Sequence, residues 1–375
     1  MSHAFCSIIA KNYLPQANVL INSLRRHNPD AVFFLLVVDA TINNRDDDDF
    51  VKILSPHDLS LNQDSLSKMH LIYDVVEFST SMKPSLLKHI LRLGFNTATF
   101  LDPDIQVFGP LNYAIEKAQE NHIVVTPHRL TPTQNYRDEI IFLKYGVFNL
   151  GFICVSKESL QFLEWWESRL ETGATRFEFS DIFTDQKWVN LLPAYFNYHV
   201  LRHPGYNVAP WNLDERDFSA TGQNFWVSDQ PLIFIHFSQM SGLLVQGGLS
   251  QDWLEKLSSI KMQTSNLTFF LSRVSDYVAN LHDSSRFMIH SEDLSSESQV
   301  FSSKRPSYRA KLILRIESGT SMTLNGNLGK RNLLDTITIE LSRFHTFQLL
   351  NQSLRADWSK IIERCRTLFS WNRSR

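Results

Sequence analysis

The sequence predicts an α/β protein built around a largely parallel sheet, and three observations favour this class. The first hundred residues alternate short apolar runs with segments of helical periodicity, which is typical of a sheet with crossover helices. Residues 33–38 are apolar throughout, as in a strand that is buried on both faces. A chain of 375 residues, 43% of them hydrophobic, can also bury a large core without disulfides or metals as staples.

The expected elements follow one another in the order that such a sheet requires. Residues 4–9 are expected to form the first strand, and Asn12 to cap the helix that follows it. Pro84 begins a second helix, and the strand after it, residues 98–101, runs directly into Asp102. Further strands are expected near residues 123–126, 147–155 and 232–237, with a helix over 158–170.

The character of the chain changes at about residue 260. We expect residues 1–260 to form one α/β domain and 261–375 to form a C-terminal α+β extension. Residues 283–307 contain nine serines, which is typical of a linker. Strands are expected around Leu312 and Ile337.

Residues 354–375 are predicted to form a basic amphipathic helix. They hold six basic and two acidic residues, and their apolar side chains recur at helical spacing. Such a helix docks on the protein's own core or lies on a membrane surface, and both alternatives stay open here. Because no apolar run approaches the roughly 18 residues of a membrane span and the start does not resemble a secretory leader, we expect a cytoplasmic protein, soluble or peripheral on the inner membrane face.

Composition excludes several classes of function. Lys and Arg number 37 against 39 Asp and Glu, so a net charge of −2 gives no long-range attraction for nucleic acid. Cys6, Cys154 and Cys365 lie far apart, which excludes a zinc ribbon and a disulfide framework. The chain also lacks the G-x-G-x-x-G, G-x-x-x-x-G-K, H-E-x-x-H and G-x-S-x-G motifs of nicotinamide, P-loop, zincin and hydrolase sites.

The chemistry-bearing residues gather where the strand of residues 98–101 ends. Asp102 and Asp104 are alternate residues, so both carboxylates can point to one place at the carboxyl edge of the sheet, where ligands of α/β proteins bind. Carboxylates there suit Mn²⁺ or Mg²⁺ with a diphosphate as the remaining ligand. His236, in an apolar strand, could complete the site. A turn or helix cap is the ordinary alternative for the aspartates, and a core histidine for His236.

Several blocks, in the same order, make residues 4–240 similar to glycosyltransferase family 8 and its bacterial relatives, which have the GT-A type of Rossmann-like fold. The family motifs are A-x-N-Y, Y-L-D-x-D-x-x-V, F-N-x-G, P-D-Q and I-x-H-[YF]. The corresponding blocks here are Ala10-Lys11-Asn12-Tyr13 with Ser23-Leu24, the helix 83–93 with Phe100-Leu101-Asp102-Pro103-Asp104-Ile105-Gln106-Val107, then Phe148-Asn149-Leu150-Gly151, Thr184-Asp185-Gln186 and Phe234-Ile235-His236-Phe237.

This resemblance implies a metal-dependent transferase that moves a sugar from a nucleotide-sugar donor, with a UDP-sugar favoured, to a glycan, lipid-linked glycan or protein acceptor of the cell envelope. It implies retention of the anomeric configuration. The implied metal ligands for Mn²⁺ (or Mg²⁺) are Asp102, Asp104 and His236. The implied catalytic residues beside the anomeric carbon are Asp185 and Gln186, and the implied donor-binding residues are Ala10, Asn12, Tyr13, Lys83, Asp102, Asp104 and Asn149.

The sequence departs from the family in two places. Many relatives carry an aspartate just before the N-Y pair, where this chain has Lys11, and the glycine and lysine after the closing histidine are replaced by Gln239 and Leu243. For the acceptor, residues 205–212 mix turn formers, amides and aromatics that suit a sugar. The expected acceptor-binding residues are Tyr206, Asn207, Trp211 and Asn212.

Two other functions remain open from the sequence. A phosphatase of the haloacid dehalogenase type also has an apolar strand ending in D-x-D, with Asp102 as nucleophile and Asp104 as acid and base. A non-catalytic module that binds sugar nucleotides or glycans would keep the same residues without transferring a sugar.

Overall fold

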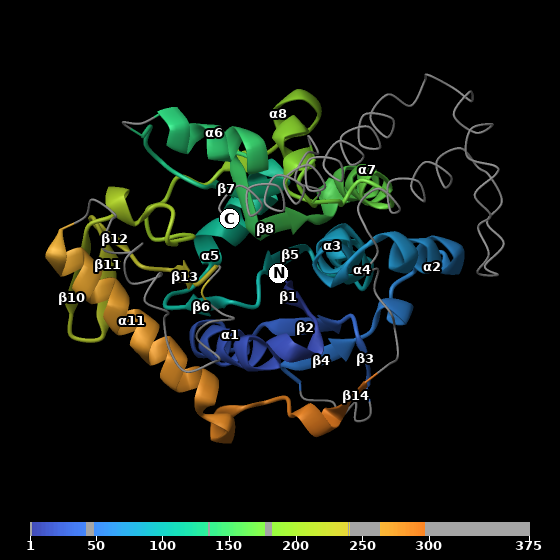
Figure 1. The fold of residues 1–375 in the computed structure, drawn as a ribbon, viewed down its shortest axis with the longest axis horizontal. Helices are drawn as coiled ribbons and strands as arrows, with labels where there is room; N and C mark the ends of the chain where they lie inside the picture. Colours follow the sequence, from blue (N-terminus) through green and yellow to red (C-terminus); the bar gives the residue numbers. More distant parts are fainter. Residues whose placement is uncertain are drawn as a thin grey trace, which may run out of the picture.

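A seven-stranded mixed sheet forms the centre of the computed structural model, which describes residues 2–42, 49–133, 136–176, 182–238, 240 and 263–296 (Figure 1). Its strand order is β4-β2-β1-β5-β8-β7-β9. Strands β4, β2, β1 and β5 run parallel, β8 is antiparallel to both β5 and β7, and β9 is parallel to β7. The predicted α/β class with a mixed, Rossmann-like central sheet is confirmed.

The elements match most of the sequence expectations. The strands of the central sheet are β1 (His3–Ile9), β2 (Val32–Val37), β4 (Val51–Leu54), β5 (Thr97–Leu101), β7 (Ile123–Pro127), β8 (Phe148–Ser156) and β9 (His199–Val200). The helices are α1 (Leu14–His27), α2 (Gln63–Ile72), α3 (Val75–Ser81), α4 (Lys83–Arg92), α5 (Asn112–Asn121), α6 (Tyr136–Tyr145), α7 (Leu160–Leu170), α8 (Leu192–Tyr195) and α11 (Thr264–His282). The smaller strands are β3 (Ala40–Ile42), β6 (Ile105–Val107), β10 (Phe218–Thr221), β11 (Asn224–Val227), β12 (Gln230–Pro231), β13 (Phe234–His236) and β14 (Leu294–Ser296).

The start of α1 differs from the prediction. Lys11–Tyr13 form a 3₁₀ turn, α1 begins at Leu14, and Tyr13 rather than Asn12 occupies the position before the helix, without a side-chain cap. The predicted cap by Asn12 is therefore wrong. Asn12 is instead exposed and lies just after the carboxyl end of β1.

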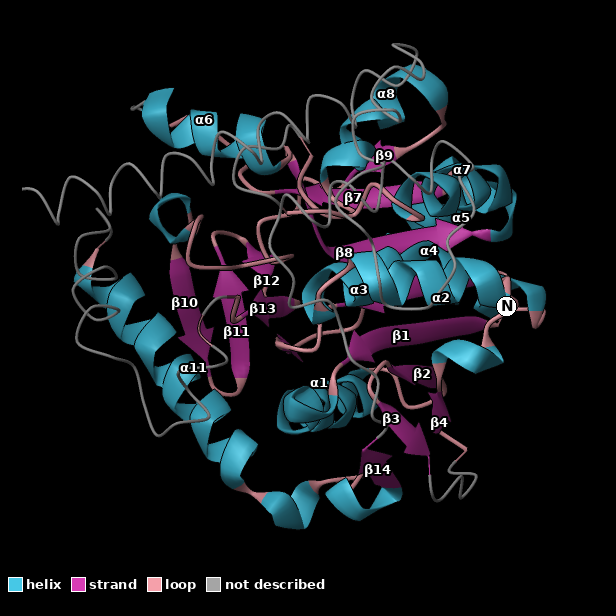
Figure 2. Cartoon of the chain, turned by 45° about the vertical axis from the view of Figure 1, so that its right-hand side comes forward, coloured by secondary structure: helices cyan, strands magenta, loops and turns pink. Residues whose placement is uncertain are grey.

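Helices cover both faces of the sheet, as the apolar strands require. In β1 the side chains alternate: Cys6 and Ile8 pack on one face with α2, α4 and α7, while Phe5 and Ile9 pack on the other with α1 and α5. Figure 2 shows β1 with α2 and α4 on one side and α1 on the other. Because β2, β1 and β5 are parallel neighbours, their carboxyl ends meet at one edge.

Beyond this edge the chain adds a second, antiparallel layer. After β5, β6 pairs antiparallel with β13, which puts His236 opposite Ile105. Helix α11 lies across β10 and β11 and packs Phe270, Val274 and Tyr277 into a third apolar cluster (Figure 2). This pairing brings two segments that are far apart in the sequence to the end of β5.

The described residues after α11 return to the first part of the sheet. Strand β14 pairs antiparallel with β3, with Leu294 opposite Ile42. Residues 283–296, part of the stretch predicted as a linker, thus contact the domain predicted for residues 1–260. The strands expected around Leu312 and Ile337 and the terminal helix lie outside the described residues. No helix in the described part is long and apolar enough to cross a membrane.

Candidate active site

Asp102, Asp104 and His236 come together at the carboxyl edge of the sheet. Nε2 of His236 lies 3.1 Å from Oδ1 of Asp104 and 3.7 Å from Oδ2 of Asp102. One ligand atom from each residue falls within 4.8 Å of the others. The side chain of His236 is 2% exposed and that of Asp102 is 30% exposed, so the cluster is buried on the histidine side and open on the Asp102 side.

Backbone hydrogen bonds fix the two aspartates in place. The amide of Asp102 donates to the carbonyl of Gly151 on β8 at 2.8 Å, and the carbonyl of Asp102 accepts from Ile105 at 3.2 Å, which closes a turn. The carbonyl of Asp104 accepts from the amide of Phe237 at 2.9 Å, just after β13. The D-x-D segment is therefore a rigid turn held from both sides, and the turn sets both carboxylates toward His236.

Asn207 determines which nitrogen of His236 faces the aspartates. Its Nδ2 donates to Oγ1 of Thr126 at 2.8 Å and to Oδ1 of Asn149 at 3.0 Å, so its Oδ1 is left to accept from Nδ1 of His236 at 3.2 Å. Nδ1 therefore donates to Asn207, and Nε2 is the nitrogen that faces Asp104 and that would bind a cation once it is deprotonated. Asn207 has a φ of +52°, a conformation that asparagine tolerates better than most residues.

Gly151 makes room for this arrangement. A methyl group at this position would lie 2.4 Å from Cε1 and 2.8 Å from Nδ1 of His236, and 2.9 Å from Oδ1 of Asn149. Only a residue without Cβ lets the imidazole approach the strand this closely. The glycine of the F-N-L-G block thus sets the position of His236.

The three side chains fit a hard divalent cation. Two carboxylate oxygens and one imidazole nitrogen leave coordination positions open on the exposed side of Asp102, where phosphate oxygens could bind. Without a metal, burial opposes the charge on His236, but Asp104 and Asp102 outweigh it and raise the pKa of His236. Burial likewise raises the pKa of Asp102, although Lys83 and His236 counteract it. A bound cation would take the place of the proton held by this cluster.

Lys83, at the first position of α4, links the cluster to a second buried carboxylate. Its Nζ lies 3.5 Å from Oδ1 of Asp102 and 3.1 Å from Oδ2 of Asp185, and it donates to the carbonyl of Leu150 at 2.8 Å. It also lies 4.5 Å from the centroid of the Phe100 ring. Burial alone would lower the pKa of Lys83, yet the two carboxylates raise it, so the ammonium stays charged.

The Asp185–Gln186 segment is held in a strained turn. Thr184 has a φ of +45°, outside the range that a β-branched residue prefers. Gln186 donates from Nε2 to the carbonyl of Tyr145 at 2.9 Å and accepts at Oε1 from the amide of Leu150 at 3.0 Å. Both ends of this amide are therefore fixed, and its oxygen faces the F-N-L-G block.

The predicted acceptor residues divide into three groups. Asn207 and Asn212 are buried, and Asn212 donates to the carbonyls of His128 and Asn207 at 3.0 Å each, so both shape the site from within. The ring of Trp211 stands edge-on to His236 at a centroid distance of 5.4 Å. Tyr206 is 2% exposed and packs in the core beside β8 and β13, so the structure does not bring it to the site.

The predicted donor-binding residues also lie in different surroundings. Asn149, 8% exposed, accepts from Asn207 and from the amide of Gly151. Asn12 lines a cavity of about 670 Å³ beside the end of β1. Ala10 and Tyr13 are partly buried against the two core clusters on either side of β1.

His128 is a site residue that the sequence analysis missed. Its ring stacks on Phe142, stands 5.4 Å from the Trp211 ring, and has Nε2 3.4 Å from Nδ2 of Asn149. Burial lowers the pKa of His128 to about 4, so the ring is neutral at pH 7. Its position just after β7, at the same edge as Asp102, is the only sequence signal for it, and that signal needs the strand order.

Comparisons with known proteins find similarity at low sequence identity. No protein-family model matches the chain. The uncharacterized proteins YfnF and YfnD of Bacillus subtilis (strain 168) are 25% and 23% identical over 247 and 272 residues, covering 64% and 69% of this chain and 82% and 85% of theirs. Among solved structures, the galactosyltransferase LgtC in complex with donor and acceptor sugar analogs gives a TM-score of 0.44 at 14% identity, covering 74% of this chain and 96% of that chain.

Proposed function

We propose that this chain is a metal-dependent glycosyltransferase that moves a sugar from a nucleotide-sugar donor, with a UDP-sugar favoured, to a glycan, lipid-linked glycan or protein acceptor. The observation that carries the proposal is the Asp102, Asp104 and His236 cluster, in which Nε2 of His236 faces both carboxylates. A buried lysine ties this cluster to Asp185 and hence to Gln186.

Asp102, Asp104 and His236 would hold Mn²⁺ or Mg²⁺. When bound, the cation supplies charge neutralisation for the diphosphate leaving group as the glycosidic bond breaks. The exposed side of Asp102 is where the diphosphate would enter, since the His236 side is closed by the core. Asn207 and Gly151 keep His236 in place while the ligand exchanges.

Lys83 would keep the reacting centre ordered. Its ammonium is shared by Asp102 and Asp185, so the metal-binding turn and the Asp185–Gln186 turn move as one unit. The sugar would lie between these turns, with the oxygen of Gln186 toward the anomeric carbon and Trp211 against the acceptor side. Both polar ends of Gln186 already bond the backbone, so the residue orients the sugar and does not accept a proton.

This arrangement supports transfer with retention. Asp185 is 2% exposed and paired with Lys83, so it is poorly placed to activate an acceptor hydroxyl from solvent. The leaving phosphate is then the group that accepts the acceptor's proton, on the same face of the sugar. Retention would be read directly from the anomeric configuration of the product.

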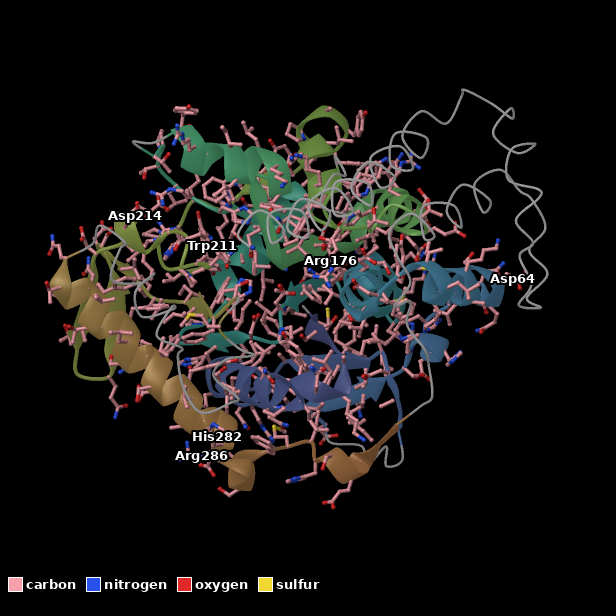
Figure 3. The ribbon with its side chains drawn as sticks, viewed as in Figure 1. Asp64, Arg176, Trp211, Asp214, His282 and Arg286 are labelled. Carbon is pink, nitrogen blue, oxygen red and sulfur yellow. The ribbon has the colours of Figure 1, made fainter. Side chains whose placement is uncertain are left out.

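The test measures ligand-dependent stability and donor breakdown on the full chain. Wild type, Asp104→Asn and Asp64→Asn are melted with UDP-, GDP-, CMP- and dTDP-sugars, with and without Mn²⁺, because a ligand of the native state raises its melting temperature. Asp64 is an exposed carboxylate on α2, far from the cluster (Figure 3). Released nucleotide is then measured for each donor that stabilises wild type.

We expect a rise in melting temperature that requires both Mn²⁺ and one donor class, kept in Asp64→Asn and lost in Asp104→Asn. Nucleotide release should fall at least about 100-fold in Asp104→Asn, as for loss of a group that stabilises the leaving charge. Equal release by Asp104→Asn and wild type would refute the proposal. Phosphate release from p-nitrophenyl phosphate without any donor response would identify a phosphatase instead.

A further inference from the structure

The cavity beside Asn12 has walls from two distant parts of the chain. Its volume is about 670 Å³, and it lies at the carboxyl ends of β1 and β2. The first wall comes from the core, through Lys11, Asn12 and Asp39. The second wall comes from the segment after α11, through Phe287, His290 and Ser291. We call residues 286–296 the return segment.

The return segment is fastened to α1 through its backbone. Asn18, fully buried, accepts from the amides of Met288 and Ile289 at 2.8 and 3.0 Å and donates to the carbonyl of Ile289 at 2.8 Å. Asn22 donates to the carbonyl of Arg286 at 2.6 Å. Figure 3 places Arg286 just beyond the end of α11, where the return segment begins.

The far end of the return segment is fastened as well. Nζ of Lys11 donates to the carbonyl of Leu294 at 2.6 Å, and β14 pairs with β3. Ile289 and Leu294 are each 2% exposed and pack in the core cluster of α1 and α5. Between these anchors, Phe287 and His290 line the cavity. Phe287 is half-buried and His290 is exposed. A segment held at both ends presents its remaining side chains in a defined place.

Lys11 connects the first wall of the cavity to the second. The ammonium of Lys11 donates to the carbonyl of Leu294 at 2.6 Å, and its amide donates to Oδ1 of Asp39 at 2.7 Å. Lys11 thus fastens the return segment. The polar groups of Lys11 are thus bonded within the protein, and the side chains of Phe287 and His290 line the cavity beside it.

The cavity and the metal cluster lie on one line along the sheet edge. Asp39 follows β2, Lys11 follows β1 and Asp102 follows β5, and these strands are parallel neighbours in the order β2-β1-β5. Adjacent strands are about 4.8 Å apart. A nucleotide with its diphosphate at Asp102 therefore points its nucleoside toward the cavity.

We propose that the return segment forms one wall of the nucleoside-binding site, with the Phe287 ring against the base and His290 as a hydrogen-bonding group at its edge. This inference rests on the proposed function and extends it: residues after 260 take part in donor binding. Lys11 fastens this wall and does not contact the ligand.

The test compares two kinds of ligand that share a diphosphate: pyrophosphate and nucleoside diphosphates. Affinities for pyrophosphate and for UDP, GDP, CDP, dTDP and ADP are measured by calorimetry with Mn²⁺ in wild type, Phe287→Ala, His290→Ala and Phe287→Tyr. His282→Ala removes an exposed imidazole at the end of α11 and is the matched control for His290→Ala (Figure 3).

We expect the best nucleoside diphosphate to bind roughly tenfold more weakly in Phe287→Ala, the scale of one lost base–aromatic stack. His290→Ala should weaken it several-fold. Pyrophosphate should bind all variants equally, and Phe287→Tyr and His282→Ala should match wild type. Lys11→Met should weaken nucleotide binding. It should also speed hydrogen exchange at residues 288–294, because Lys11 supports their backbone hydrogen bonds.

Failures of the two proposals are distinguishable. Suppose that wild type binds a nucleoside diphosphate more tightly than pyrophosphate, and that Phe287→Ala and His290→Ala bind this nucleotide as tightly as wild type does. The role of the return segment in nucleoside binding is then refuted, while the proposed function stands. If no nucleoside diphosphate exceeds pyrophosphate, the nucleoside site is absent from this edge. If neither ligand binds with Mn²⁺, the proposed function is refuted and the wall with it.

Discussion

Replacing Gly151 by alanine tests the whole site with one methyl group. The added Cβ would lie 2.4 Å from Cε1 of His236, whereas carbon atoms in contact are about 3.5 to 4.0 Å apart. The imidazole must therefore retreat by about 1 Å or more. Overpacking of this kind costs about 1 to 3 kcal/mol in folding stability.

The same displacement should remove the metal. Ligand distances in metal sites hold to about 0.2 Å, so a ring moved by about 1 Å no longer coordinates in the same position. The displaced ring also loses its hydrogen bond to Oδ1 of Asn207, which fixes the nitrogen that faces the aspartates. We expect Mn²⁺ affinity of Gly151→Ala to fall at least about 100-fold, beyond the 10- to 100-fold typical of a lost supporting bond.

Calorimetric titration with Mn²⁺ measures this effect, and urea unfolding measures the stability. Gly222→Ala is the control: Gly222 has a φ of +63° with no atom near its missing Cβ, so alanine there costs about 1 to 2 kcal/mol through backbone strain alone. It should keep wild-type Mn²⁺ affinity. If Gly151→Ala, correctly folded, also binds Mn²⁺ like wild type, then His236 is not a ligand and the geometric argument fails.

Three further predictions follow from the same contacts. Lys83→Met leaves Asp185 buried without its counter-charge, so urea unfolding at pH 7 should show a loss of about 3 kcal/mol that shrinks at lower pH as carboxylates protonate; an unchanged midpoint would contradict the pairing. Asn207→Gly keeps the positive φ but frees the His236 ring, and Mn²⁺ affinity should fall about 10- to 100-fold, whereas equal affinity would show that the amide has no positioning role. The raised pKa of His236 means that protons compete with metal: Mn²⁺ affinity should rise with pH and level off above that pKa, and a profile flat from about pH 6 to 8 would oppose this. The folding stability of the metal-free protein should change with pH in the opposite direction. The stabilisation from protonated His236 is present below its unfolded pKa of about 6.5 and is lost as pH rises through the raised folded pKa.

Local patterns predicted the fold class and the pairing of Asp102 with Asp104. Strands such as residues 98–101 and 147–155 are continuous apolar runs bounded by turn formers, so their placement needs no distant contact. Asp102 and Asp104 could be paired from alternation and from the position of ligands in α/β sheets. His236 was paired with them through the resemblance, and the pairing of β6 with β13 gives the physical reason.

The surroundings of other residues could not be predicted from the sequence because they depend on distant partners. Tyr206 lies in a turn-rich segment that suits a sugar site, yet the packing of β8 against β13 takes its ring into the core. Asn12 was expected to cap a helix that begins two residues later. His128 carries no local signal, since Phe142, Asn149 and Trp211 reach it from three other segments.

The sequence by itself determined the α/β class, the order of the elements and the carboxylates at the end of β5, because hydrophobic periodicity and turn residues act over a few positions. Only the tertiary structure decided which nitrogen of His236 faces the aspartates, why residue 151 is glycine and where Lys83 places its charge. It also brought residues 286–296 to the end of β1, through Asn18 and Lys11. These features are hydrogen bonds and close contacts between residues up to about 280 positions apart, and a sequence pattern records neither partner of such a contact.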